Sequence, residues 1–432
     1  MSLSTTPQRL TLIALTILLF AGYAAAQAGS LDPTFATGGI FISPTVRGTA
    51  DAVAIQSDGK ILVAGGGVVN NNFAAIITRL NTNGTLDTSF GSGGFATIDN
   101  AGSFFAMILE SSGKIVAAAN GNPDANSGFV ELARFNSNGT LDASFGKDGT
   151  TTTQAVPFTP SFDSTGAIAL QSNGEILVAA SSPGVMARFT STGQLDTTFG
   201  TGGIANLVSS FPTQILVQAS GKILVSAGAP QPTPAAQASI VSRYNSNGSL
   251  DTTFAAAGMM ATVATASAMT ESGGKIVIAG AVTSKISAPP ASGDVGFGIV
   301  RYSANGVIDT SFGTGGIAVV DFGSSAPLSG AFAIAIQSNG DIVAGGAAAQ
   351  GPENTGLNSA FGLTRVTSTG ALDTTFGTDG IVTTTIVSGT EEFSFVTGLA
   401  TQSDGKIVAI GTTIADQEFG TGSADVARYL AQ

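Results

Sequence analysis

The chain of 432 residues contains no cysteine, no histidine and no tryptophan. The absence of cysteine excludes disulfide bonds and thiol nucleophiles, and the absence of both cysteine and histidine excludes zinc sites of the usual kind. Without histidine, a catalytic triad built around an imidazole base cannot form. From these residue types we therefore expect no cofactor.

Charge is also scarce, because only 10% of the residues are charged, against about 25% in a typical soluble domain. The net charge of −12 argues against a nucleic-acid partner, since such binding depends on Lys and Arg contacts with phosphate. What is abundant is apolar residues, at 43%, and glycine, at 58 residues. This combination favours many short strands joined by tight turns over helices or disorder.

The first 28 residues have the pattern of a secretory signal peptide. Arg9 precedes an apolar run that begins at Leu10 and ends in small residues, where 24–26 and 26–28 both fit an A-x-A cleavage site. An uncleaved anchor helix is the alternative. We find no second membrane span, so we expect residues 29–432 to be exported as a monomer, to the periplasm, the cell surface or the medium.

One phrase recurs seven times, as in "TNGTLDTSFGSGG" at Thr82 and "SNGTLDASFGKDG" at Ser137. Its Leu-Asp or Ile-Asp pair begins at residues 31, 86, 141, 195, 250, 308 and 372, so the copies lie 54 to 64 residues apart. In each copy a phenylalanine follows three residues after the aspartate. A repeat of about this length indicates a solenoid or a propeller, with one supersecondary unit per repeat.

Each repeat contains four short apolar segments separated by Gly, Asn and Asp turns. Examples are "AVAIQ" from Ala52, "KILVAG" from Lys60, an Arg-ended segment such as "ELARF", and the Leu-Asp phrase itself, which we take as the fourth strand. Asp-Gly and Asn-Gly turns favour hairpins. We therefore predict an all-β fold, a seven-bladed β-propeller of four-stranded antiparallel blades with the Ala-rich first strand nearest the axis.

The two chain ends complement each other in this scheme. The chain stops after an Arg-ended segment, "ADVARYLAQ", and the exported part opens on a Leu-Asp phrase, "GSLDPTF". Pairing them would complete the last blade and close the ring, which removes the exposed edges of an open array. We therefore expect residues 29–432 to form one propeller domain.

The combination "QSDGKILVAG … RLNTNGTLDTSFGSGG" resembles the delta-60 repeat family of bacterial exported propellers, from Ser30 to Tyr429. It is more distantly similar to NHL-type propeller repeats. The resemblance implies a propeller fold and export, and it implies no particular activity.

An arginine precedes the repeat aspartate by eight residues in six repeats, and in the seventh the two would meet across the ring closure. We expect each arginine to bind its aspartate or to lie over the phenylalanine, as a structural element. A ring of arginines that binds an anion is the alternative. The pairs are Arg79 and Asp87, Arg134 and Asp142, Arg188 and Asp196, Arg243 and Asp251, Arg301 and Asp309, Arg365 and Asp373, and Arg428 and Asp32.

Two further patterns imitate known sites. "SDGK" turns such as Ser57 to Lys60 match the S-x-x-K acylase signature, but that signature needs a helix, and Glu175 and Asp341 replace the lysine in two repeats. The Asn83 turn resembles part of a calcium loop, yet it lacks the clustered carboxylates and the distal glutamate. Calcium therefore remains a weak alternative.

The loop between the second and third segments varies in length and composition, and we place function on that variable-loop face. An acidic group in the last repeat is the candidate ligand site, for a cation or sugar hydroxyls: Glu391, Glu392, Asp416, Glu418 and Asp425. A solvated acidic rim is the alternative. We expect a non-catalytic module that binds a glycan or a protein at this face. One alternative is a carbohydrate hydrolase or lyase that uses carboxylates of the variable-loop face. Another is a structural envelope or adhesion protein with exposed aromatic residues.

Overall fold

The computed structural model describes residues 27–69, 72–99, 101–120, 130–152, 166–181, 184–228, 239–262, 266–283, 295–322, 329–349, 359–387, 392–415 and 422–431. Within these ranges the chain forms strands and turns and no helix. It follows that no described helix is long and apolar enough to cross a membrane. The predicted signal peptide lies outside the described residues, apart from Gln27 and Ala28.

Four sheets of four antiparallel strands follow one another along the chain. They are β6 (Phe104–Leu109), β7 (Ile115–Asn120), β8 (Val130–Phe135) and β9 (Thr150–Thr152); β10 (Ala167–Leu170), β11 (Ile176–Ala180), β12 (Val185–Phe189) and β13 (Ile204–Asn206); β14 (Pro212–Val217), β15 (Ile223–Gly228), β16 (Ser239–Tyr244) and β17 (Met259–Ala261); and β18 (Ala268–Ser272), β19 (Lys275–Thr283), β20 (Val295–Tyr302) and β21 (Ile317–Val320).

The other twelve strands form one hydrogen-bonded set in which the same meander recurs. They are β2 (Ala52–Ile55), β3 (Ile61–Val69), β4 (Asn72–Leu80) and β5 (Phe95–Asp99); β22 (Gly330–Ile336), β23 (Ile342–Ala349), β24 (Ser359–Val366) and β25 (Ile381–Thr384); and β26 (Glu392–Thr401), β27 (Ile407–Ala415), β28 (Ser423–Tyr429) and β1 (Ile40–Gly48). Short pairings of β1 with β3 and of β24 with β26 connect the three groups.

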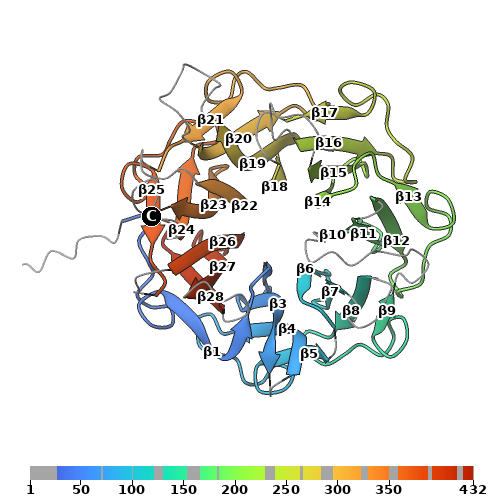
Figure 1. Cartoon of the computed structure of the whole chain (residues 1–432), viewed down its shortest axis with the longest axis horizontal. Helices are drawn as coiled ribbons and strands as arrows, with labels where there is room; N and C mark the ends of the chain where they lie inside the picture. The colour runs from blue at the N-terminus through green and yellow to red at the C-terminus, as the bar shows by residue number, and fades with distance from the viewer. Residues whose placement is uncertain are drawn as a thin grey trace, which may run out of the picture.

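The sheets are arranged around a central axis, as a propeller (Figure 1). Strands β6, β10, β14, β18, β22 and β26 lie nearest the centre, and strands such as β9, β13 and β17 lie at the rim. The first strand of each repeat is therefore the inner strand. The turns between the first and second strands and between the third and fourth strands lie at one end of the sheets, here called the turn face, and the remaining connections lie at the loop face.

The last sheet is built from both ends of the chain. Strand β1 pairs antiparallel with β28, with Ile40 opposite Ala427. Upstream of β1, Leu31 bridges Tyr429, and the Asp32 amide donates to the Arg428 carbonyl at 2.8 Å. The opening Leu-Asp phrase thus lies against the closing strand.

The Leu-Asp phrase itself is not the fourth strand, so that part of the strand prediction is wrong. In the second copy Leu86 makes an isolated bridge with Leu80 and the next residues form a turn, and the outer strand β5 begins only at Phe95. The reason is the aspartate, because Asp87 Oδ1 accepts hydrogen bonds from the amide of Ser89 at 3.1 Å and from its hydroxyl at 2.6 Å. Such side-chain bonds to the local backbone favour a turn over an extended strand.

The core lies between neighbouring sheets. Every residue of β11 and β12 is buried, as expected for β-branched and alanine-rich strands covered on both faces. One apolar cluster joins Leu62 and Ala64 of β3 with Phe104 of β6 and Ile115 of β7, across two adjacent sheets. Each sheet is therefore stabilised by burial against its neighbours, at about 25 cal/mol per Å² of apolar surface.

Candidate functional site

The repeat arginine, aspartate and phenylalanine form one cluster in every copy. The arginine Nε donates to the aspartate Oδ2 at 2.7–3.0 Å. The guanidinium carbon lies 4.5–4.8 Å from the centre of the phenylalanine ring. The phenylalanines are fully buried, so a desolvated cation–π contact of this kind contributes on the order of 1–2 kcal/mol.

Each arginine also reaches the next sheet. Its Nη1 donates at 2.5–2.7 Å to a backbone carbonyl in the following turn: Arg79 to Ser137, Arg134 to Ser191, Arg188 to Ser246, Arg243 to Ala304, Arg301 to Ser368, Arg365 to Ala431, and Arg428 to Thr82. The glycine of that turn packs closely on the previous phenylalanine. At Gly84, whose φ is 81°, a Cβ would lie 2.8 Å from the ring of Phe35. The arginines therefore join successive sheets.

A lysine gives most of these aspartates a second cation. In five repeats its Nζ lies 2.5–3.2 Å from the same carboxylate oxygen that the arginine contacts, as Lys60 does at Asp87. Burial alone raises the pKa of Asp32, but hydrogen bonds from Thr34 and Lys406 and the charge of Arg428 outweigh it and lower the pKa to about 2. The lysine of the S-x-x-K pattern is thus part of an ion pair.

The asparagine turns use their side-chain oxygens in a similar way. Asn83 Oδ1 accepts hydrogen bonds from the amide and the hydroxyl of Thr85, at 3.1 and 2.8 Å. The described residues hold no group of three or more Asp or Glu side chains that could bind a metal ion. The Asn83 side-chain oxygen thus bonds to its own turn.

A glutamine or glutamate ends the inner strand of each repeat, beside the arginine. The positions are Gln56, Glu110, Gln171, Gln218, Glu271, Gln337 and Gln402. At Gln337 both ends of the amide are used, because Oε1 accepts from Arg365 Nη1 at 3.3 Å and Nε2 donates to the Gly405 carbonyl at 2.9 Å. Gln402 repeats both contacts, with Arg428 and the carbonyl of Gly59.

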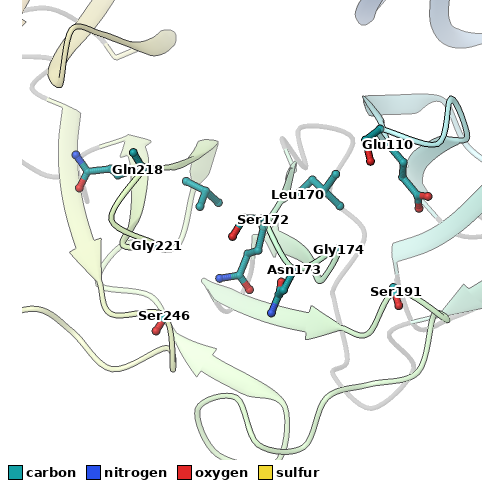
Figure 2. Close-up of a pocket in the computed structure, with 13 residues that line it drawn as sticks. Glu110, Leu170, Ser172, Asn173, Gly174, Ser191, Gln218, Gly221 and Ser246 are labelled. Atoms are coloured by element: carbon teal, nitrogen blue, oxygen red, sulfur yellow. The ribbon is translucent and has the colours of Figure 1, made fainter.

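Two of these glutamines differ. Gln171 and Gln218 are 7% and 5% exposed, and within the described part of the chain neither Oε1 has a hydrogen-bond partner. Both line a cavity of about 610 Å³ at the turn face, between three successive sheets. In Figure 2, Glu110 and Gln218 lie on opposite sides of this opening, with Leu170, Ser172 and Asn173 between them.

Of the five acidic candidates of the last repeat, the structure describes only part. Glu391, Asp416 and Glu418 lie outside the described residues, and only the backbone of Glu392, in β26, is described. Asp425, expected on the surface, is instead fully buried in β28, where Oδ2 accepts from the Ser423 hydroxyl at 3.1 Å. The carboxylate of residue 425 therefore lies inside the fold, in a strand whose two edges pair with β27 and β1.

Sequence reasoning missed a half-buried carboxylate at the loop face. Asp51, at the start of β2, accepts hydrogen bonds from Thr49 Oγ1 at 2.7 Å and from Ser103 Oγ at 2.6 Å, and Ser103 precedes β6 of the next sheet. Burial raises the pKa of Asp51, and the two hydroxyls only partly offset this effect. No repeat pattern marks this residue, so only the fold could reveal the contact.

Aromatic side chains are exposed at the loop face. Phe211, just before β14, is 50% exposed, and Phe332 of β22 is 42% exposed. The ring of Phe332 lies 6.1 Å from that of Phe395, which lies 5.3 Å from that of Phe393, so these three residues form an aromatic cluster across two sheets. Each lies at the end of an inner strand away from the turn face.

The sequence matches the profile of a family described as "Domain of unknown function (DUF5122) beta-propeller" over residues 56–90, 110–145, 171–199, 218–254 and 272–312. These five matches coincide with five of the repeats defined above, and they support the assignment of the chain to the β-propeller repeat proteins. No curated protein matches the sequence.

Solved structures of similar fold include several enzymes. Virginiamycin B lyase from Staphylococcus aureus is 12% identical, with a TM-score of 0.44, over 90% of this chain and 99% of the lyase. The polysaccharide lyase Uly1 is 9% identical, with a TM-score of 0.46, over 96% and 94%. An α-L-arabinofuranosidase from Fusarium graminearum is 10% identical, with a TM-score of 0.40, over 93% and 96%. Similarity at this level transfers no activity to this chain.

Proposed function

We propose that the chain is an exported, closed seven-bladed propeller of the delta-60 type, and that it acts as a non-catalytic binding or scaffold module. The arginine contacts support closure, because they run from each sheet to the next and the last of them, from Arg428 to the Thr82 carbonyl, links the end of the chain to its beginning. The pairing of β1 with β28 supports it too.

The binding surface is the loop face, and the ligand is a glycan or a protein. The aromatic cluster of Phe332, Phe393 and Phe395, in which Phe332 is exposed and the other two are half-buried, is the observation that carries this assignment. Exposed apolar side chains that gather at one place mark interaction sites on soluble proteins, and aromatic residues are enriched in interfaces. The connections at the loop face vary in length and composition along the chain and would supply selectivity.

The test is a glycan array and an affinity measurement on the purified chain, repeated with Phe211→Ser and Phe332→Ser, and with Glu391, Glu392 and Glu418 changed to Ala. A matched control is Val307→Ser, which removes a 63% exposed apolar side chain at the turn face. We expect the phenylalanine variants to lose binding and the control to keep it.

Equal binding by the phenylalanine variants and the parent chain would contradict a loop-face site. The alternative, a carbohydrate hydrolase or lyase, predicts that a bound glycan is cleaved, and that the glutamate changes abolish cleavage. Product analysis of the bound glycans separates the two functions.

A further inference from the structure

We propose that Asn305 is a site of spontaneous covalent modification, at which the side-chain amide is lost and aspartate or isoaspartate forms. Asparagine is thermolabile in proteins, and a following glycine promotes the reaction because it adds no side chain to hinder attack by its own amide nitrogen. Several Asn–Gly pairs lie wholly within the described residues, and their asparagines are all exposed: Asn83, Asn138, Asn173, Asn247, Asn305 and Asn339. Exposure and local sequence therefore do not single out Asn305.

The side chain of Asn305 lacks a restraint that the other five asparagines share. In those turns Oδ1 accepts a hydrogen bond from the amide nitrogen two residues later, at 3.0–3.1 Å. Where the sequence is Asn-Gly-Thr or Asn-Gly-Ser, the hydroxyl adds a second bond at 2.8 Å. In the Asn305 turn the corresponding amide, that of Val307, donates instead to the Ser303 hydroxyl at 3.2 Å. The Asn305 carboxamide is therefore the least restrained of the set.

The glycine amide does not distinguish these turns. Gly306 donates to the Ser303 carbonyl at 2.9 Å, and the glycine of each of the other five pairs makes the same bond at the same distance. This bond must open before the nitrogen can attack, which slows the reaction in all of the turns alike. The expected difference in rate thus comes from the asparagine side chain.

Arg243 favours the reaction at the same position. Its Nη1 lies 3.4 Å from Asn305 Oδ1, in addition to its hydrogen bond to the Ala304 carbonyl at 2.7 Å. When the Gly306 nitrogen attacks Cγ, negative charge develops on Oδ1, and a guanidinium at this position stabilises that charge.

The reaction needs only water as a co-reactant. The Gly306 nitrogen loses its proton to solvent base and bonds to Asn305 Cγ. The bond between Cγ and Nδ2 then breaks, ammonia leaves with a proton from water, and a cyclic succinimide remains. Water opens the ring at Cγ, which gives aspartate, or at the backbone carbonyl carbon, which gives isoaspartate. The net change is the uptake of water and the release of ammonia, with no oxidation or reduction.

The modified residue lies on a contact between two sheets. The Asn305 carbonyl, in the turn between β20 and β21, accepts a hydrogen bond from the Ala255 amide, before β17, at 3.1 Å. The equivalent contacts of the other repeats measure 2.7–2.8 Å. Isoaspartate carries the main chain through the side-chain carbons and converts this carbonyl into a carboxylate. Its formation therefore weakens the junction between the sheet of β14–β17 and the sheet of β18–β21.

The experiment follows conversion in the folded parent chain at physiological temperature and mildly alkaline pH, by peptide mapping with mass spectrometry and by enzymatic methylation of isoaspartate. We expect Asn305 to convert about tenfold faster than Asn83, Asn138 and Asn247, because two hydrogen bonds restrain each of those side chains. In guanidinium chloride the four sites should convert at similar rates, since the restraints are then gone.

Two reciprocal variants test the cause. Val307→Thr supplies the missing hydroxyl and should slow conversion of Asn305 toward the rate of Asn83. Thr85→Val removes the hydroxyl bonded to Asn83 and should speed conversion there. Near-ultraviolet circular dichroism establishes that both variants are folded.

Equal rates at Asn305 and Asn83 in the folded parent chain would overturn the proposal, whether or not the variants fold. A difference that persists unchanged in guanidinium chloride would also overturn it, because local sequence would then be the cause. An unchanged rate at Asn305 in a folded Val307→Thr chain would show that the restraint does not control the reaction.

Discussion

Two repeats carry an acidic residue in place of the usual lysine at the turn face, Asp341 in one and Glu175 in the other. These two side chains differ by one methylene group, and the neighbouring glutamines make different hydrogen bonds. At Gln337 the usual lysine is replaced by Asp341, whose short side chain accepts from Asn339 Nδ2 at 2.6 Å and leaves Arg365 to bind the glutamine. At Gln171 the lysine is replaced by Glu175, which is long enough to reach Arg188. The first glutamine joins two sheets, whereas the second is left with an open acceptor.

The comparison shows how one exchange within the repeat changes a hydrogen-bond network. The same arginine binds aspartate, phenylalanine and the next turn in both regions. What changes is only the partner of one guanidinium N–H. Five predictions sharpen or break this comparison, from the largest expected effect to the smallest.

The largest effect should come from acid, which acts on all seven repeat aspartates together. The folded pKa of each is lowered below 3.8, that of Asp32 to about 2. The stability they contribute is therefore present above the ordinary pKa and is lost as the pH falls through the folded value. We expect the free energy of unfolding, measured in urea, to drop steeply between about pH 4 and pH 2.

As the pH falls, the aspartates of the two compared repeats, Asp196 and Asp373, should be protonated before those of the repeats that carry the lysine. Asp196 and Asp373 lack the second cation that a lysine provides, because their repeats carry Glu175 and Asp341. Carboxyl NMR titration should show these two aspartates protonating at a higher pH than Asp87. A common midpoint for all three would remove the distinction between repeats with and without the lysine.

Removal of the arginine should have the next largest effect. Arg188→Ala and Arg365→Ala leave a partly buried aspartate without a cation and remove the contacts with the phenylalanine and the next turn, and we expect a loss of about 3 kcal/mol in unfolding free energy. Arg79→Ala is the matched control, because Lys60 stays 2.8 Å from Asp87, and it should cost less. Equal losses in chemical denaturation would mean that the lysine adds nothing.

Replacing the glutamines should change the unfolding free energy less than removing the arginines, and the two glutamine variants should differ from each other. Gln337→Met breaks two hydrogen bonds and should destabilise the fold by about 1–3 kcal/mol. Gln171→Met removes an acceptor that has no partner, so thermal unfolding should change little or rise slightly. If Gln171→Met were the more damaging variant, the open acceptor would have to be satisfied in solution.

The smallest effect on stability should come from removing one methylene group at residue 175 or adding one at residue 341. Glu175→Asp should release Arg188 to contact Gln171, with an effect of less than about 1 kcal/mol on unfolding free energy. Asp341→Glu is the reciprocal variant, which should take Arg365 from Gln337 and cost a similar amount in urea denaturation.

Much of the fold could be predicted from the sequence, because the repeat is written in residue types with strong local effects. Gly84 has a positive φ that its Asn-Gly turn requires, and the strand of Lys60 and the arginine strand form as their apolar runs predict. The fourth strand was misplaced, since Asp87 bonds to Ser89 and turns the chain. That competition between side chain and backbone is invisible in hydrophobic periodicity.

The repeat clusters were also within reach of sequence reasoning, whereas the cavity was not. The spacing of Arg79 and Asp87 anticipates their contact across a hairpin. The open oxygen of Gln171 depends on how far Glu175 reaches and on which sheet comes next, and neither distance is encoded in spacing along the chain.

By itself the order of amino acids determined the repeating strands, the tight turns and the residue types that meet within one hairpin, because these depend on interactions between near neighbours in the chain. Only the tertiary structure decided which guanidinium N–H each glutamine could share, that Asp425 is buried, and that Asp51 meets Ser103 of the next sheet. Those outcomes depend on distances between separate sheets, which the packing of side chains sets.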